Sequence, residues 1–512
     1  MDNGALQNTL KSLCKVMWDA NVTNPITYVT QISYLLFLKM LEEIDAEQKE
    51  ASNSTYQSLY GEFEVAGEML NFEPLRWSIL TTDPDNERML RTLRDTIPQL
   101  ARHPKLSQGA RAVFQNASVV IPTGATLRRA VDLIAPISFL SVDADVKGDL
   151  FEHLVSDLGS QKKAAQFRTP RHLVRVIVQM VNPQIGGTVC DSACGSGGFL
   201  ITAYEHIILN NTSTEFIKET IGPDGLPVRR GIGDKLNRAQ WYFLQKGTLH
   251  GFEGDQDILR MAAMNAVLHQ FDQSPLVHRD SICGSEDKWD EVQFDYILEN
   301  PPFSGSRGDA KHSLRIEKGD KYVLFLAAAL RSLRQGGTAS IIFPNGLLFG
   351  DSNSHLYVKS RLLKEYDLQA VVTLPKGMFE PYTPNPTCFI IFRNTGRPTE
   401  NVWFFRVEGD GSSLRKARKF GPQYRNDFPD LLRMWPNRET QEGCAWLVPA
   451  QKIIDNNYNM TLSTLGLIEP EIVNHQEPEE ILASLSAKEE RIFQLIEEMK
   501  GLLEGENSNG AV

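Results

Sequence analysis

The sequence predicts an α/β fold with a doubly wound, mostly parallel sheet, an all-α N-terminal domain and a C-terminal helical tail. Short apolar strand patterns alternate with helical patterns from residue 170 to residue 393, which is typical of a parallel sheet covered by helices. One of these strands runs into a glycine-rich turn, and another stops at an Asn-Pro-Pro turn. Residues 5 to about 140 instead carry apolar residues at helical spacing.

The chain has 512 residues, which is too long for one hydrophobic core. We expect a helical N-terminal domain over residues 1–145, an α/β domain over 146–465 and a partner-docking helix and tail over 466–512. No apolar run reaches the roughly 18 residues of a membrane span, and the N-terminus lacks a signal-peptide pattern. The six cysteines are not spaced like zinc ligands, so we expect reduced thiols, no metal site and a cytoplasmic protein.

The formal net charge of −11 bears on nucleic-acid binding. A protein that binds DNA unaided usually presents a basic face, because phosphate contacts dominate the affinity. We therefore expect a partner to supply much of any contact with DNA.

The turn before the first strand of the sheet, residues 166–171, is polar and contains a proline. Thr169 is placed as the N-cap of the following helix, and Pro170 suits the first helical position. His172 then falls in the first turn of the helix, where we expect a solvated side chain rather than a catalytic base.

The glycine-rich turn follows a buried-strand pattern that ends at Asp191. Its small residues, Ser192 to Gly198, let backbone amides approach a ligand at the start of a helix. An acid at the strand end would repel a pyrophosphate and attract a cationic amino group. This favours S-adenosylmethionine over a dinucleotide, and the lack of a GxxxxGK[ST] pattern argues against a phosphate-binding loop.

Two further acids follow predicted strands. Glu253 ends the second strand, where a carboxylate can accept both ribose hydroxyls, with Asp255 and Asp257 as competing candidates. Asp280 follows the third strand, where an adenine amino group could be bound. A single such acid is more often a solvated loop residue, but three in succession at strand ends favour a binding site.

The strand pattern from Phe294 to Leu298 stops at the turn Asn300-Pro301-Pro302-Phe303. The two prolines fix φ and remove two backbone donors, so the turn is stiff. The side-chain oxygen of Asn300 and the carbonyl of Pro301 can both accept hydrogen bonds from an exocyclic amino group. Such acceptors localise the nitrogen lone pair in the transition state, while Phe303 stacks on the substrate ring. A base in duplex DNA would have to be flipped out to reach this turn.

Several surface segments have less specific patterns. Residues 210–247 are expected to form a surface excursion, and residues 304–321 a mobile, basic loop. The basic cluster at 415–425 could contact phosphate or form a solvated face. The last helix, Pro478 to Glu504, has an apolar stripe close to heptad spacing, which suits either a partner helix or the chain's own domain.

Asp191-Ser-Ala-Cys-Gly-Ser-Gly-Gly-Phe followed by Asn300-Pro-Pro-Phe resembles the amino-methyltransferases of DNA. The helical N-terminal region, Gln166-Phe-Arg-Thr-Pro and Phe343-Pro-Asn-Gly-Leu-Leu-Phe are similar to the modification subunit of type I restriction–modification systems. The resemblance covers about residues 5–465. It implies a Rossmann-like methyltransferase domain over 146–465 that methylates adenine N6 with S-adenosylmethionine as donor and no metal.

The resemblance also implies the partners and the site. The partners are double-stranded DNA, a specificity subunit that reads the target, a second copy in a two-modification, one-specificity assembly, and a restriction subunit. The residues implied in catalysis are Asn300, Pro301, Pro302 and Phe303. Those implied in cofactor binding are Gln166, Phe167, Thr169, Asp191, Ala193, Gly195, Gly197, Glu253 and Asp280.

Three residues depart from the family pattern. Ser192 stands where proline is frequent, Arg168 where an aromatic residue is common, and Glu299 where a small residue is common. Two related activities stay open: methylation of a glutamine amide in protein, and methylation of cytosine N4, whose enzymes more often have serine in place of Asn300. A catalytically idle, donor-binding scaffold is the alternative from another class.

Overall fold

The computed structural model describes residues 3–51, 56–138, 169–222, 224–269, 271, 275–380, 383–415, 418–469 and 478–508. Contacts divide the chain into two compact units, Met1–Leu465 and Gly466–Val512, and each is described by itself. The expected domain boundary at residue 145 lies outside the described residues.

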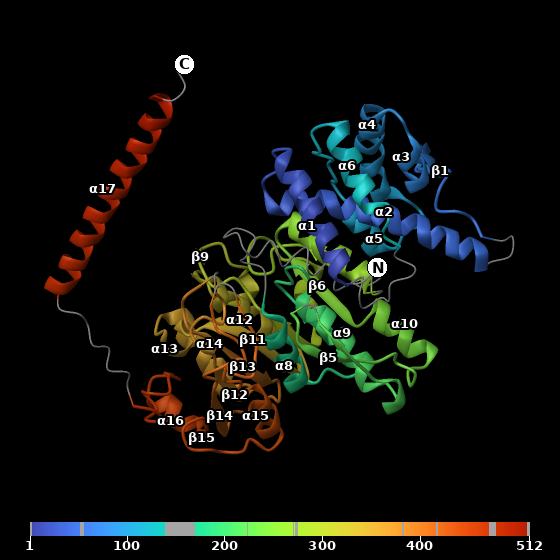
Figure 1. Cartoon of the computed structure of the whole chain (residues 1–512). Helices are drawn as coiled ribbons and strands as arrows, with labels where there is room; N and C mark the ends of the chain where they lie inside the picture. Colours follow the sequence, from blue (N-terminus) through green and yellow to red (C-terminus); the bar gives the residue numbers. More distant parts are fainter. Residues whose placement is uncertain are drawn as a thin grey trace. The chain divides into compact units, whose positions relative to one another are not determined.

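A mixed sheet of nine described strands forms the centre of the first unit (Figure 1). Its order from one edge to the other is β7 (Leu276–His278), β6 (Leu249–Glu253), β3 (Val189–Asp191), β8 (Phe294–Glu299), β11 (Leu333–Pro344), β13 (Thr387–Arg393), β12 (Asp367–Thr373), β14 (Asn401–Arg406) and β15 (Ala445–Pro449). Strand β13 is antiparallel to both neighbours and β15 is antiparallel to β14, whereas the other pairings are parallel. The predicted doubly wound, mostly parallel sheet is therefore confirmed.

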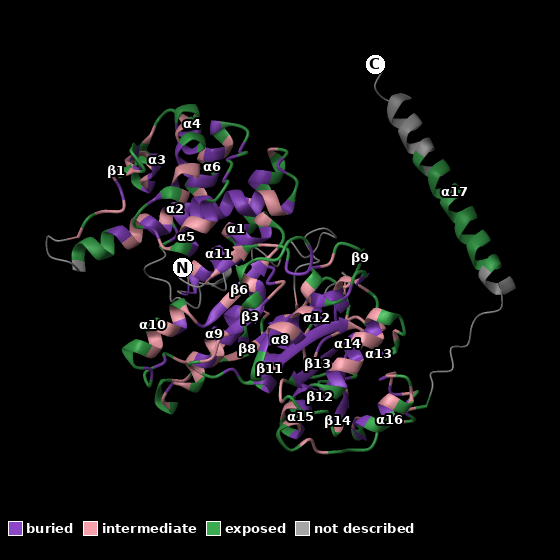
Figure 2. Ribbon diagram, turned by 180° about the vertical axis from the view of Figure 1, so that it is seen from behind, coloured by how far each residue is buried: buried purple, intermediate pink, exposed green. Residues whose placement is uncertain are grey.

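The central strands are apolar along their length because helices cover both faces of the sheet. Figure 2 shows these strands as buried, and in β13 every residue from Thr387 to Phe392 is buried. Helix α8 (Arg171–Val181) precedes the first strand of the sheet, and the helices that connect its strands include α9 (Gly198–Asn210), α11 (Gln256–Leu268), α12 (Lys321–Ser332) and α14 (Asn353–Lys364).

The order of the strands locates a binding crevice. From β3 the chain moves outward through β6 to the edge strand β7, and it then returns to β8 on the other side of β3. Ligands of open α/β sheets bind outside the carboxyl ends of the strands, where the order reverses in this way. A ligand-binding site is therefore expected at the carboxyl ends of β3 and β8.

The N-terminal region is mainly helical, with one exception. Its helices are α1 (Asn3–Asp19), α2 (Pro25–Ala51), α3 (Trp77–Thr82), α4 (Asn86–Thr96), α5 (Gln108–Phe114) and α6 (Gly124–Ile134). A short antiparallel hairpin, β1 (Glu62–Val65) and β2 (Glu68–Asn71), interrupts them, so the region is not purely α-helical. Its two-residue turn, Ala66 and Gly67, has both φ angles positive, as the twist of a tight hairpin requires.

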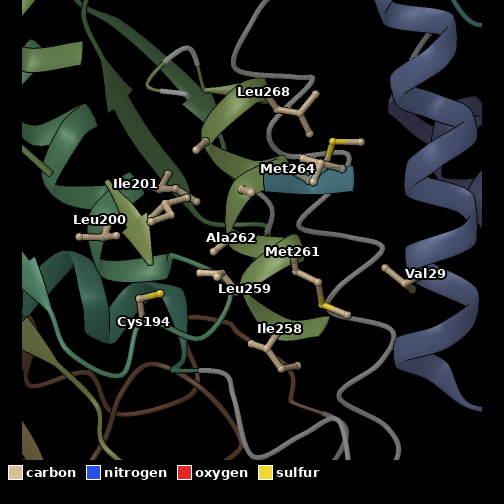
Figure 3. Packing of buried hydrophobic residues seen from close by; sticks show 14 of the residues in the cluster. Val29, Cys194, Leu200, Ile201, Ile258, Leu259, Met261, Ala262, Met264 and Leu268 are labelled. Atoms are coloured by element: carbon tan, nitrogen blue, oxygen red, sulfur yellow. The ribbon is translucent and has the colours of Figure 1, made fainter. Parts of the chain in front are cut away.

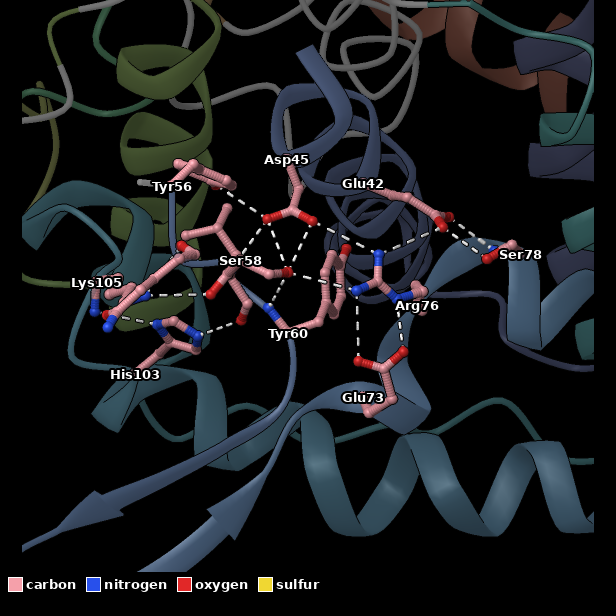
Figure 4. A network of polar contacts seen from close by, with 12 residues as sticks. Glu42, Asp45, Tyr56, Ser58, Tyr60, Glu73, Arg76, Ser78, His103 and Lys105 are labelled. Atoms are coloured by element: carbon pink, nitrogen blue, oxygen red, sulfur yellow. Dashed lines mark hydrogen bonds and ion pairs between the residues drawn. The ribbon is translucent and has the colours of Figure 1, made fainter. Parts of the chain in front are cut away.

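A polar network joins α2 to the segment before this hairpin (Figure 4). The Asp45 side chain accepts hydrogen bonds from the Tyr56 hydroxyl at 2.9 Å, the Ser58 hydroxyl at 2.8 Å and the Leu59 amide at 2.6 Å. The Arg76 guanidinium lies 3.5 Å from the same carboxylate. Burial alone would raise the Asp45 pKa, but these hydrogen bonds outweigh it and hold the pKa below its usual range.

Helix α11 connects the sheet with the N-terminal helices. Figure 3 shows Met261 and Met264 on the side of α11 that faces α2, and Ala262 on the side that faces Leu200 of α9. Arg260 adds polar contacts, because its guanidinium donates to the backbone carbonyls of Gln115 and Asn116 at 3.0 Å each. The N-terminal helices thus pack directly on the helix that follows β6.

The remaining segments include two expected surface features. Residues 210–247 form a hairpin of β4 (Lys218–Ile221) and β5 (Pro227–Arg230) and then helix α10 (Arg238–Lys246). In the second unit, helix α17 (Pro478–Ser508) exposes large apolar side chains, including Leu482, Leu485, Ile492, Phe493, Ile496 and Met499. Among the described helices, none is both long enough and apolar enough to cross a membrane.

Candidate active site

A cavity of about 550 Å³ opens at the carboxyl ends of β3, β6 and β8. It brings together predicted residues that are up to 134 positions apart in the sequence, because all of them except Thr169 stand at or after the end of a neighbouring strand. The predicted residues in its wall are Thr169, Asp191, Ala193, Gly195, Glu253, Asp280, Asn300, Pro301, Pro302 and Phe303. Gly197 is not in the wall, and Gln166 and Phe167 lie outside the described residues.

The turn between β3 and α9 is shaped by glycines. Gly195 and Gly197 have φ angles of 54° and 87°, a region that other residues rarely adopt. Gly197 therefore shapes the turn, although it does not line the cavity. A side chain at Gly198 would also meet the Arg171 guanidinium, whose Nη1 atom donates to the Gly198 carbonyl at 2.8 Å. The turn thus brings its backbone close to the cavity.

Two of the predicted acids lie beside this turn, Asp191 buried and Glu253 half-buried. Asp191 is only 2% exposed, and its carboxylate accepts a hydrogen bond from the Ala193 amide at 3.1 Å. Burial and then the neighbouring Glu299 charge raise its pKa well above the usual range. Glu253 accepts from the amides of Gly195 and Asp255 at 3.0 Å each, yet burial still raises its pKa. The part of the cavity beside the β3–α9 turn therefore contains two carboxylates, those of Asp191 and Glu253, that form no ion pair with a cation among the described residues.

The competing candidates for Glu253 have other contacts. Asp255 caps α11 by accepting from the Asp257 and Ile258 amides, and Asp257 pairs with Arg260. Asp255 also lines the cavity, but its carboxylate caps α11, so Glu253 remains the preferred candidate.

Asp280 is the third predicted acid. Its Oδ1 atom accepts from the Ile282 and Cys283 amides at 3.0 Å each, which fixes the carboxylate at the turn after β7. Its Oδ2 atom lies 3.5 Å from Nη1 of Arg307, a cavity-lining residue that the sequence patterns did not single out. One carboxylate oxygen is thus used by the turn, and the other faces a basic side chain.

Asn300 follows the last residue of β8 and is oriented by Thr169. The Asn300 side-chain amine donates to the Thr169 hydroxyl at 2.9 Å. The Asn300 Oδ1 atom is buried and has no hydrogen-bond partner in the part of the chain that the structure describes. A buried acceptor without a donor costs free energy, so this oxygen is prepared for a ligand that donates a hydrogen bond. Phe303 packs edge-to-face against Phe379, with ring centroids 5.7 Å apart.

Two expectations about the segment before α8 are wrong. Thr169 is not the N-cap, because α8 begins at Arg171 with Pro170 in the cap position, and the Thr169 hydroxyl binds Asn300 instead. His172 is not solvated: it is 6% exposed, and its Nε2 atom lies 2.9 Å from the Asp410 carboxylate. Both side chains are used by partners more than 100 residues away, which local sequence signals cannot reveal.

The segment 304–321 also differs from the expected mobile, basic loop. It contains the short strand pair β9 (Ser306–Arg307) and β10 (Gly319–Asp320). Lys311 is 2% exposed, and its ammonium donates to both carboxylate oxygens of Asp290 at 2.9 and 3.0 Å. The segment that follows Phe303 is therefore anchored by a buried ion pair.

Replacing Lys311 by methionine is expected to lower the free energy of unfolding by about 2 kcal/mol, since Asp290 loses the charge-assisted hydrogen bonds from the Lys311 ammonium but keeps Arg279 as a close partner. The measurement is urea unfolding followed by circular dichroism. Lys318→Met is the control from the same segment, and its exposed side chain predicts a change within about 0.5 kcal/mol. Equal stabilities of the two variants would contradict the anchoring role.

Two arginines of the basic cluster at 415–425, Arg418 and Arg425, form contacts within the domain. The Arg418 guanidinium donates to the Gly377 and Met378 carbonyls at 3.1 and 2.6 Å, and it lies 3.1 Å from Asp410. Arg425 lies 2.7 Å from the Asp427 carboxylate. These two arginines connect loops of the domain.

Residues that sequence reasoning missed also belong to the site. Arg171, Phe379 and Asn385 line the cavity, and the Pro384-Asn385-Pro386 turn before β13 was a usable signal for the last of them. Glu299 had been noted only as a departure from the family pattern. It is fully buried directly behind Ser192, whose hydroxyl donates to it.

Comparison with known proteins identifies the family. Residues 142–469 match the N-6 DNA Methylase model, and residues 6–134 match the HsdM N-terminal domain. The chain is 26% identical to the type I restriction enzyme EcoEI methylase subunit of Escherichia coli, over 98% of each chain. It is 25% identical to the StySPI methylase subunit of Salmonella potsdam, over 84% of this chain and 76% of that one.

Solved structures agree with this fold. A chain from work on complex assembly and conformational transition of the type I restriction–modification system is 25% identical and superposes with a TM-score of 0.67, over 98% of both chains. A modification subunit of a putative type I restriction enzyme from Vibrio vulnificus is 22% identical with a TM-score of 0.62, over 88% of this chain and 93% of that one. The family match spans more than half of the sequence, including every described residue of the cavity. The chain belongs to the N-6 DNA methylase family.

Proposed function

We propose that this chain transfers a methyl group from S-adenosylmethionine to N6 of a flipped adenine in double-stranded DNA, as the modification subunit of a type I restriction–modification system. The observation that carries the proposal is the buried Asn300 Oδ1 atom, which lies at the cavity and has no hydrogen-bond partner among the described residues. An exocyclic amino group supplies the donor that this oxygen lacks.

The acceptor end acts on the nucleophile. Asn300 Oδ1 and the Pro301 carbonyl accept the two N6 hydrogens of adenine, which makes the nitrogen pyramidal and localises its lone pair. The lone pair then attacks the methyl carbon, the bond from that carbon to sulfur breaks, and the N6 proton leaves to solvent. Phe303 contributes a stacking face whose orientation is supported by the edge-to-face contact with Phe379. No strong base is needed.

The donor end binds a cation. S-adenosylmethionine supplies an activated methyl group on a sulfonium and carries an ammonium besides. Asp191 is assigned to the ammonium, Glu253 to the ribose hydroxyls and Asp280 to the adenine amino group, with Ala193, Gly195 and Gly197 shaping the turn. The raised pKa values of Asp191 and Glu253 support this assignment, because buried carboxylates without a cation are stabilised by a cationic ligand. Gln166 and Phe167 are proposed to complete this end, and no metal is required.

The partners follow from the relatives and from the surface. The similar proteins are methylase subunits of type I enzymes, so we propose a specificity subunit that reads the target, a second copy of this chain and a restriction subunit. A net charge of −11 supports a partner that holds the DNA. The exposed apolar side chains of α17 support a docking role for the segment 466–512. We propose residues 1–145 as the helical domain and residues 146–465 as the catalytic domain. The location is proposed to be the cytoplasm.

The test is methyl transfer from labelled S-adenosylmethionine to unmethylated DNA, with and without the specificity subunit, followed by digestion to nucleosides. We expect label in N6-methyladenine only when the partner is present. Label in N4-methylcytosine would contradict the target assignment, and label in protein would support the glutamine-amide alternative. Donor binding without any transfer would support the idle scaffold.

A further inference from the structure

Glu299 lies between the two ends of the proposed site. It is the last residue of β8, directly before Asn300, and its side chain is fully buried. Its Oε2 atom accepts a hydrogen bond from the hydroxyl of Ser192, which lines the cavity at the donor turn. Its Oε1 atom is buried and has no hydrogen-bond partner among the residues that the structure describes. The carboxylate is therefore separated from the cavity by little more than the Ser192 side chain.

The groups that face Glu299 are acidic or neutral. On β3 these are Cys190 and Asp191. The Glu253 charge on β6 also raises the pKa of Asp191. On β11 the paired residue is Ile341. Arg279, which follows β7, acts on Cys190 but forms its ion pairs with Asp287 and Asp290. Among the described residues, no cation forms an ion pair with either Glu299 or Asp191.

This environment makes the charge of Glu299 variable near neutral pH. Burial raises the Glu299 pKa to about 7, although the hydrogen bonds from Ser192 oppose that rise. Above this pH the carboxylate is ionised and adds a second negative charge beside Asp191. Below it the site loses that charge. An ionised carboxylate in such surroundings lowers the stability of the ligand-free protein. Groups that act on a ligand commonly have this property.

We propose that Glu299 is a specificity-determining residue that favours the cationic methyl donor over its demethylated product. The inference rests on the proposed function. Methyl transfer converts the donor sulfonium into a neutral thioether, so the ligand loses one positive charge. An ionised Glu299 near that position attracts the donor more than the product and thereby favours product release. In a water-poor site, a charge within several ångströms changes an affinity ratio by about tenfold or more.

The experiment measures dissociation constants of the full-length chain for S-adenosylmethionine and S-adenosylhomocysteine by calorimetry, between pH 6 and pH 8. We expect the product-to-donor ratio of these constants to rise about tenfold across this range, as Glu299 ionises. Glu299→Gln keeps an oxygen that can accept from Ser192 but removes the charge. It should give a lower ratio that stays nearly constant over the same range. Ser192→Ala keeps the charge and should retain the rise, shifted toward higher pH because the carboxylate loses a hydrogen bond.

The outcomes separate this inference from the proposed function. A pH-independent ratio in the parent protein, or the same rise in Glu299→Gln, would overturn the role of Glu299 while leaving the donor site intact. Binding of neither ligand at any pH would instead contradict the proposed function itself. A loss of the rise in folded Ser192→Ala that persists in measurements up to about pH 9 would also overturn the inference, because it would assign the effect to the hydrogen bond rather than to the charge.

Discussion

Asn300→Ala is expected to reduce the rate of methyl transfer by at least about a thousandfold while changing donor affinity less than about threefold. Removal of one preorganised acceptor of this kind typically costs 10²–10³ in turnover. The loss is expected to be greater here because Asn300 Oδ1 is the buried acceptor proposed for the N6 amino group, and Pro301, Pro302 and Phe303 have no side-chain acceptor to replace it. Single-turnover methylation assays give the rate, and calorimetry with S-adenosylmethionine gives the affinity.

A matched variant tests the orientation of the same amide. Thr169→Val keeps the shape of the side chain but removes the hydroxyl that accepts from Asn300 Nδ2. The amide then loses its fixed orientation, and we expect a decrease in turnover of about tenfold, smaller than that of Asn300→Ala. If Asn300→Ala lost donor binding as severely as turnover, Asn300 would belong to the donor end. If Thr169→Val were as inactive as Asn300→Ala, Thr169 would contact a substrate directly.

The sheet was predictable because its strands carry their own signals. β6 ends at Glu253, as predicted for the second strand, and β13 ends at Arg393, where the predicted α/β pattern stops. The antiparallel insertion of β13 between β11 and β12 was not predictable, because a strand buried on both faces has the same apolar pattern in either direction. The hairpin β1–β2 was missed since its strands are only four residues long and mostly exposed.

The site was predictable to the extent that its residues follow strands. Asp191, Glu253 and Asn300 each stand at a strand end, so the parallel sheet brings them to one cavity. The partners of Asn300 and Glu299 were not predictable, because Thr169 reaches Asn300 across 131 residues and Ser192 reaches Glu299 across 107. Such contacts depend on the packing of the strands and leave no local pattern. The same argument applies to every buried polar pair that joins distant turns.

Asp191→Asn is expected to weaken donor binding by at least about 30-fold, since loss of a buried, charge-assisted contact costs about 2–5 kcal/mol. The substituted amide retains an oxygen that can accept from the Ala193 backbone amide, so the turn should keep its shape. Calorimetry with S-adenosylmethionine measures the affinity. An unchanged affinity would remove Asp191 from the donor site.

The same substitution should stabilise the protein without ligand at pH 8. Burial and the Glu299 charge raise the Asp191 pKa in the folded state, so ionisation at high pH opposes folding and the neutral amide removes that opposition.

Asp295→Asn is the matched control on β8 and should have the opposite effect on stability. Burial alone would raise the Asp295 pKa, but hydrogen bonds from Thr188 and the Arg334 charge hold it below its usual range. Its ionised form thus stabilises the fold above the unfolded pKa, and that contribution is lost as the pH falls. Thermal unfolding at pH 8 should therefore move in opposite directions in the two variants. A carboxylate whose favourable partner is a ligand lowers the stability of the ligand-free protein and raises the stability of the complex. The opposite shifts of the two variants therefore distinguish a ligand-binding carboxylate from a structural one on the same sheet.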